Sequence, residues 1–208
     1  MPDSPSLGDG LIRSHELFHA LTDDVHAAYE LLEQDRQSQL LRRSVARAIF
    51  AYIEAALECI RIEVRSSVRR GEHPEPLSER ELKTLGSLSL FQSDAGKFLP
   101  LDQSLKRTFK LAICIWRLNH RFGAAGEGYR AFVAAKSSRN RLTHPKTFYD
   151  IEVTDRDMHF YSVAFVWFRA EFTALLRKRI ESFLVGLEPE DQEALRQLTS
   201  SVQNAADA

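Results

Sequence analysis

The stretch VARAIFAYIEAALECI, residues 45–60, indicates the class of fold because its hydrophobic residues recur at helical spacing. Apolar side chains three or four residues apart form one face of an amphipathic helix. Here that face comprises Val45, Ile49, Ile53, Ala56 and Ile60. The flanking sequence extends the predicted helix over residues 37–70. A second face is charged and is expected to be exposed to solvent, with a subunit interface as the alternative; it carries Arg43, Arg47, Glu54, Glu58, Arg61 and Arg65.

The same helical period continues on both sides of this stretch. We predict further helices over residues 11–33, 78–90, 101–121, 129–144, 155–183 and, more weakly, 188–204. Ser78 with Glu81, and Thr154 with Asp157, have the spacing of helix-capping pairs. The helix over 101–121 is apolar on more than one face and is therefore expected to be the most buried. No stretch alternates with the period of a strand, so the sequence predicts an all-α helical bundle of about five to seven helices.

The chain divides into three parts. We expect a disordered N-terminal tail over residues 1–10, one helical domain over 11–185, and a C-terminal helix and tail over 186–208. Residues 148–153 are predicted to form a short extended link before the last long helix. On that helix the residues expected to face the core are Val163, Val166, Trp167, Ala170, Ala174 and Leu175.

Composition excludes several classes of protein. The 208 residues carry 28 Lys and Arg against 29 Asp and Glu, a formal net charge of −1, which argues against a protein that coats DNA. No apolar run approaches the roughly 20 residues needed to cross a bilayer, and no signal peptide is recognisable. Cys59 and Cys114 lie in apolar helical patterns and are expected to be reduced thiols in the core. The sequence therefore predicts a cytoplasmic protein without a membrane partner.

A basic island stands out in this balanced composition. Residues 130–149 contain no Asp or Glu, and their cations are Arg130, Lys136, Arg139, Arg141 and Lys146. His144 lies among them and is the only side chain there that titrates near neutral pH. Pro145 disfavours helical geometry at the preceding residue, so the helix should end at His144. Such a site could bind a phosphate and transfer a proton, although cations also favour a helix C-terminus for purely structural reasons.

At Arg139-Asn140, with His144 five positions after the arginine, the chain resembles the HEPN superfamily. These all-α domains occur widely in bacterial toxin and defence systems, and their motif is an Arg, a polar residue such as Asn, and a His four to six positions after the Arg. The Pro145-Lys146 continuation, the short link and the long helix after it are also similar to members of the superfamily. The resemblance in architecture covers residues 40–185, whereas the motif itself covers about ten residues.

The resemblance implies a metal-independent endoribonuclease, a hydrolase of the toxin or defence type that acts as a homodimer and needs no cofactor. His144 would transfer protons at the ribose 2′-hydroxyl or the leaving oxygen, Arg139 would stabilise charge on the phosphorus oxygens, and Asn140 would orient its neighbours. The expected supporting residues are Glu54, Arg141 and Lys146. RNA or a nucleotide would be the ligand, and an antitoxin protein a partner. The alternative is an inactive relative, a dimer that binds RNA or nucleotides or serves as a scaffold.

A second motif competes with the first. His15-Glu16-Leu17-Phe18-His19 matches the H-E-x-x-H sequence, in which two His on one helical face bind zinc and the Glu acts as a general base. The match stands too near the N-terminus for the sheet that usually precedes this motif in zinc peptidases. In the extended metzincin form of the motif, a third histidine would stand where this chain has Val25. A solvent-facing helix surface explains these residues better, so a zinc metallopeptidase is the weaker alternative and no metal is expected.

Overall fold

In the computed structural model, the described residues are 7–73, 75–86 and 99–184, and within these ranges side chains are described for residues 16–182. Every element in these ranges is helical, which confirms the all-α class. The elements are α1 (Leu7–Gln34), α2 (Gln39–Arg69), α3 (Glu79–Thr84), α4 (Leu101–Ile115), α5 (Glu127–Thr143), the 3₁₀ turn η1 (Phe148–Ile151) and α6 (Asp155–Leu184). The predicted helix over 188–204, most of the N-terminal tail, and residues 87–90 of the predicted helix over 78–90 lie outside the described residues.

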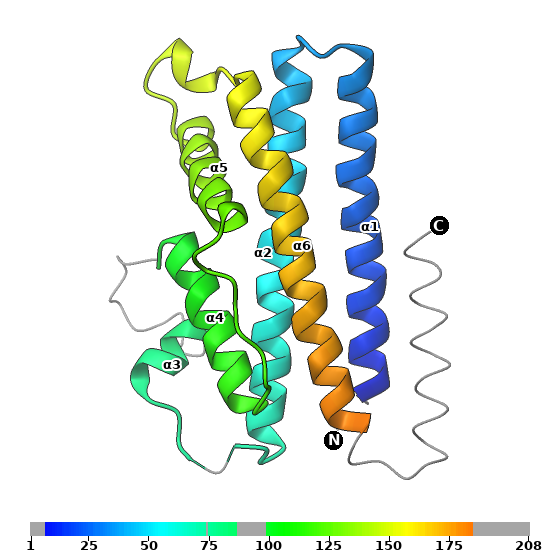
Figure 1. The fold of residues 1–208 in the computed structure, drawn as a ribbon, viewed down its shortest axis with the longest axis vertical. Coiled ribbons are helices and arrows are strands. Elements are labelled where there is room, and N and C mark those ends of the chain that lie inside the picture. Colours follow the sequence, from blue (N-terminus) through cyan, green and yellow to red (C-terminus); the bar gives the residue numbers. More distant parts are fainter. Residues whose placement is uncertain (1–6, 74, 87–98, 185–208) are drawn as a thin grey trace, which may run out of the picture.

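The centre of the bundle is α2. It contacts α1, α4, α5 and α6, and its predicted apolar face is buried, with Ile49 and Ile53 at 0% exposure. Figure 1 shows α1, α2 and α6 running along the long axis, with α4 and α5 on the side away from α1. The helix predicted over 101–121 is well buried, although it is not the central one: seven of the 15 residues of α4 are buried, against 12 of the 31 residues of α2. The helix α4 ends at Ile115, because Arg117 has a left-handed backbone (φ 51°), and Cys114, expected in the core, is exposed.

The inward face of α6 differs from the prediction. Val166 is 67% exposed and Ala170 is also exposed, although Leu175 is buried as expected. The side chains that enter the core instead are Tyr161, Ala164, Phe165, Phe168 and Phe172. The sequence of α6 is apolar on nearly all sides, so its periodicity does not select one face. Aromatic side chains remove the most area from water, which explains why they occupy the core.

Local signals at the helix ends are confirmed. Ser78 and Glu81 form a reciprocal capping box at α3. At the start of α6, the Thr154 N–H donates to the Asp157 carboxylate at 3.0 Å and the Asp157 N–H donates to the Thr154 hydroxyl at 3.2 Å. The link before α6 is not extended as predicted, because residues 148–151 form the turn η1, whose start is capped by Asp150.

Within the described ranges, no helix is both long and apolar enough to span a bilayer.

Candidate functional site

A surface groove of about 420 Å³ lies between α2 and the C-terminal half of α5. The α2 side is lined by Ala46, Arg47, Phe50, Ala51 and Glu54, and the α5 side by Arg139, Leu142 and Thr143. The volume is in the range of pockets that hold small molecules or one unit of a polymer. The groove therefore combines charged and apolar side chains from two helices that are far apart in sequence.

Arg139 and Glu54 meet across this groove. One guanidinium nitrogen of Arg139 lies 2.7 Å from a carboxylate oxygen of Glu54, and the two side chains are 34% and 45% exposed. The guanidinium carbon is 5.8 Å from the centroid of the Phe50 ring. The carboxylate and the ring restrict the orientation of Arg139, while its exposed edge retains N–H donors that a phosphate oxygen could accept. The structure thus brings the predicted supporting carboxylate beside the arginine of the motif.

His144 stands at the end of α5. It is the C-cap residue, with φ −128° and ψ 61°, and its N–H donates to the Asn140 carbonyl at 3.1 Å. The helix therefore ends where Pro145 predicts. The His144 and Asn140 side chains are exposed, and neither lines the groove, although Thr143 next to His144 does. The structure places the arginine of the motif in the groove and its asparagine and histidine on the exposed surface at the end of the same helix.

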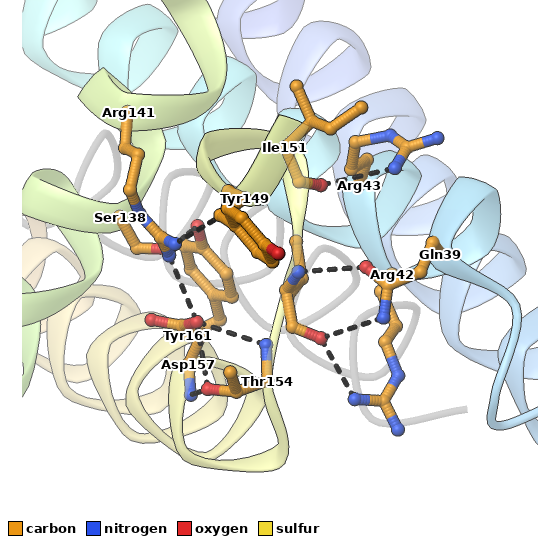
Figure 2. Close-up of polar contacts among 11 residues, drawn as sticks. Gln39, Arg42, Arg43, Ser138, Arg141, Tyr149, Ile151, Thr154, Asp157 and Tyr161 are labelled. Atoms are coloured by element: carbon orange, nitrogen blue, oxygen red, sulfur yellow. Dashed lines mark hydrogen bonds and ion pairs between the residues drawn. The ribbon is translucent and has the colours of Figure 1, made fainter. Parts of the chain in front are cut away.

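Arg141 points into the protein. Its guanidinium donates to the Ser138 hydroxyl and the Asp157 carboxylate, each at 3.1 Å, and to the Tyr149 carbonyl at 3.5 Å. The hydroxyl of buried Tyr161 donates to Ser138 at 2.9 Å. Figure 2 shows these contacts joining α5, η1 and the start of α6. Arg141 therefore fixes the end of α5 relative to α6 and does not lie in the groove.

This network also fixes the ionisation of Asp157. Burial alone would raise the pKa of its carboxyl group, but hydrogen bonds from Thr154 and Ser138, together with the charge of Arg141, outweigh that effect and hold the pKa below its usual value. Asp157 is consequently an anion at neutral pH. It caps α6 and pairs with Arg141 at the same time, so one carboxylate couples the two helices.

The remaining cations of the basic island do not converge on the groove. Lys136 forms an ion pair with Asp102 of α4 at 2.6 Å. The backbone N–H of Lys146 donates to the Asp150 carboxylate at 2.9 Å, and Lys146 is exposed beyond the end of α5. Arg130 is exposed near the start of α5. Of the five cations in the island, Arg139 alone lines the groove.

The first turns of α2 contain a set of contacts that sequence analysis missed. Arg42 is only 6% exposed, and its guanidinium donates to the carbonyls of Arg36 at 2.8 Å and Val153 at 2.9 Å. Gln39 exchanges two hydrogen bonds with the backbone of Val153, and Arg43 donates to the Ile151 carbonyl at 3.1 Å (Figure 2). The link between α5 and α6 is thereby held from both sides. A sequence pattern could not distinguish buried Arg42 from the adjacent Arg43, which is only partly buried.

The charged face of α2 is likewise not simply solvated. Arg61 lies against α4, where it donates to the Thr108 hydroxyl at 3.3 Å and to the Ser104 hydroxyl. Arg65 donates to the Leu85 carbonyl just after α3. The expectation of a solvent-exposed stripe is therefore wrong for these arginines, which connect α2 to the surrounding elements.

The H-E-x-x-H stretch lies within α1. His19 is 3.8 Å from Asp23, one turn further along the helix. No group of three or more His, Cys, Asp or Glu side chains that could hold a metal ion occurs among the side chains that the structure describes. The His15 side chain lies outside that set, and Glu16 is exposed. A zinc site at this stretch stays the weaker alternative, and the motif alone supports it.

The structure thus presents a groove in which Arg139 meets a carboxylate from a second helix. Comparison with known proteins adds no family to this geometry. No protein-family model, curated protein or solved structure matches the chain.

Proposed function

We propose that this chain is an HEPN-like protein that binds RNA at the groove between α2 and α5 and cleaves it without a metal ion. The observation that carries the proposal is the ion pair of Arg139 with Glu54, which holds a partly exposed guanidinium at the groove. The same helix ends, five residues later, at an exposed histidine. These are the two groups that transesterification of RNA requires: a charge for the phosphate and a base for the ribose.

The chemistry would proceed by attack of the ribose 2′-oxygen on the adjacent phosphorus. His144 accepts the proton of the 2′-hydroxyl as the new P–O bond forms and the bond to the 5′-oxygen breaks. The 5′-oxygen then takes up a proton from solvent water or from the protonated imidazole of His144, which leaves a 2′,3′-cyclic phosphate on one product and a 5′-hydroxyl on the other. Arg139 stabilises the negative charge that develops on the non-bridging oxygens. Asn140, exposed one turn before His144, would orient the imidazole or the substrate.

Glu54 would act as a positioning residue, because its contact with Arg139 fixes where the guanidinium can meet the phosphate. Arg141 would support the site indirectly through its contacts with Ser138 and Asp157. Lys146, exposed just beyond His144, would supply a further cation near the RNA. A cytoplasmic homodimer that faces two such grooves toward each other would present His144 from both copies, and an antitoxin protein would restrain the activity.

A second candidate is an inactive protein that binds RNA or a nucleotide, or a scaffold dimer. It is favoured by the placement of His144, which does not line the groove, and by the existing partner of Arg139. In this case the groove would hold a phosphate, but no base would reach the ribose.

RNA cleavage in the presence of EDTA distinguishes the two candidates. We expect the purified protein to cleave RNA and to leave 2′,3′-cyclic phosphate ends, and His144→Ala to abolish cleavage while the protein stays folded, because the imidazole is exposed. His159→Ala is a matched control, since His159 is an exposed histidine on α6. Binding of RNA without cleavage would favour the inactive candidate, and equal cleavage by wild type and His144→Ala would reject the proposed catalytic role.

A further inference from the structure

One arginine on the charged face of α2 differs from the others. Arg43, Arg61 and Arg65 each donate to another segment of the protein: Arg43 to the link after α5, Arg61 to α4, and Arg65 to the residue after α3. Arg47 is exposed and lines the groove, and no residue in the described ranges forms a hydrogen bond or ion pair with its side chain. The fold therefore uses the other three guanidinium groups and leaves that of Arg47 available to a ligand.

The position of Arg47 relative to Arg139 defines a direction along the groove. Arg47 precedes Glu54 by seven residues, about 10 Å along the axis of α2 on the same face. Since Arg139 pairs with Glu54, the two guanidinium groups lie at different positions along the groove. Apolar side chains contributed by Ala46, Ala51 and Leu142 complete the lining.

The charges of the groove follow from the same contacts. Glu54 lies beside Arg139, so Arg47 is the cation of the lining that has no carboxylate next to it. A single phosphate bound at Arg139 would leave the guanidinium of Arg47 without a partner further along the groove. A ligand with two phosphates separated by a less polar unit would contact both guanidinium groups and place that unit against the apolar wall. A chain of nucleotides has this alternation, whereas a nucleoside monophosphate does not.

We propose that Arg47 binds a second phosphate of the ligand, so that the groove takes a single-stranded polynucleotide running along α2 and not a mononucleotide. This inference rests on the proposed function only in that Arg139 marks the site of the first phosphate. Arg47 is then a binding residue for the flanking part of the strand and takes no part in proton transfer. It sets the substrate class and the line along α2 that the strand follows.

Binding of a short fluorescent 2′-O-methyl RNA, which lacks the nucleophilic 2′-hydroxyl, tests the inference separately from cleavage. Arg47→Ala is expected to weaken binding about tenfold at low salt, the size of one lost phosphate contact. The slope of log K against log salt should also become shallower by about 0.7, as for one fewer neutralised phosphate on a single strand. Binding of a nucleoside monophosphate should not change. Arg130→Ala is the matched control, because Arg130 is an exposed arginine outside the groove.

The possible results distinguish this inference from the proposed ribonuclease activity. If the wild type binds the oligonucleotide, and Arg47→Ala weakens this binding while Arg130→Ala does not, the inference holds even when no RNA is cleaved. If the protein cleaves RNA in a manner that depends on Arg139, but Arg47→Ala and Arg130→Ala have the same affinity and salt slope, the inference is wrong and the ribonuclease proposal stands. Absence of oligonucleotide binding by the wild type, or equal weakening of monophosphate binding by Arg47→Ala, would also overturn it.

Discussion

Replacing Arg139 by alanine should separate activity from stability. If the proposed function is right, Arg139→Ala removes a group that stabilises charge in the transition state, and RNA cleavage should fall by about 10²–10³-fold. The free energy of unfolding should change little, because the arginine is partly exposed and lies at the wall of a groove. A residue with a structural role would show the opposite result.

The expected loss of stability follows from the contacts of Arg139. Its ion pair with Glu54 joins side chains that are 34% and 45% exposed, and exposed pairs of this kind contribute about 0.5 kcal/mol. The guanidinium lies 5.8 Å from the centroid of the Phe50 ring, which adds about 0.5 kcal/mol at a partly exposed site. The total is about 1 kcal/mol, whereas the catalytic loss corresponds to about 3 kcal/mol in the transition state.

Urea denaturation, monitored by circular dichroism, measures the change in unfolding free energy. Initial rates of RNA cleavage in EDTA measure the loss of activity. Arg130→Ala serves as the control for loss of one positive charge from the same helix. A decrease in unfolding free energy of more than about 3 kcal/mol would show that Arg139 is a structural residue. Cleavage at the wild-type rate by a folded Arg139→Ala protein would refute its role in stabilising the phosphate.

Two further predictions concern the contacts around the link between α5 and α6. Arg42→Ala should lower the free energy of unfolding by about 3 kcal/mol in urea denaturation, since it removes a buried donor to the carbonyls of Arg36 and Val153; a loss below 1 kcal/mol would show that water replaces these bonds. The pKa of Asp157 is lowered in the folded protein, so its contribution to stability is present above about pH 4, the unfolded pKa, and is lost as the pH falls through the folded pKa. Asp157→Asn should therefore make the unfolding free energy depend less steeply on pH below about pH 5, and equal acid dependence in the two proteins would contradict this.

The sequence by itself determined the helical class and many of the helix ends. The spacing of Val45, Ile49 and Ile53 is a local property of the chain, and so are the caps at Ser78 and Thr154. Each depends on interactions within a few residues, which a pattern can capture. The position of His144 at an exposed helix end could be predicted from the sequence for the same reason.

The tertiary structure alone decided which faces meet. The sequence of α6 is apolar on several sides, so only packing selects Phe168 for the core and leaves Val166 in solvent. The arginines in the first half of α2 look equivalent in sequence. In the structure, however, Arg42 is buried, whereas Arg47 lines the groove. Ion pairs between distant segments, such as Arg139 with Glu54, depend on the packing of α5 against α2. Pairing across the bundle is a property of helix packing, which the local period of a sequence does not encode.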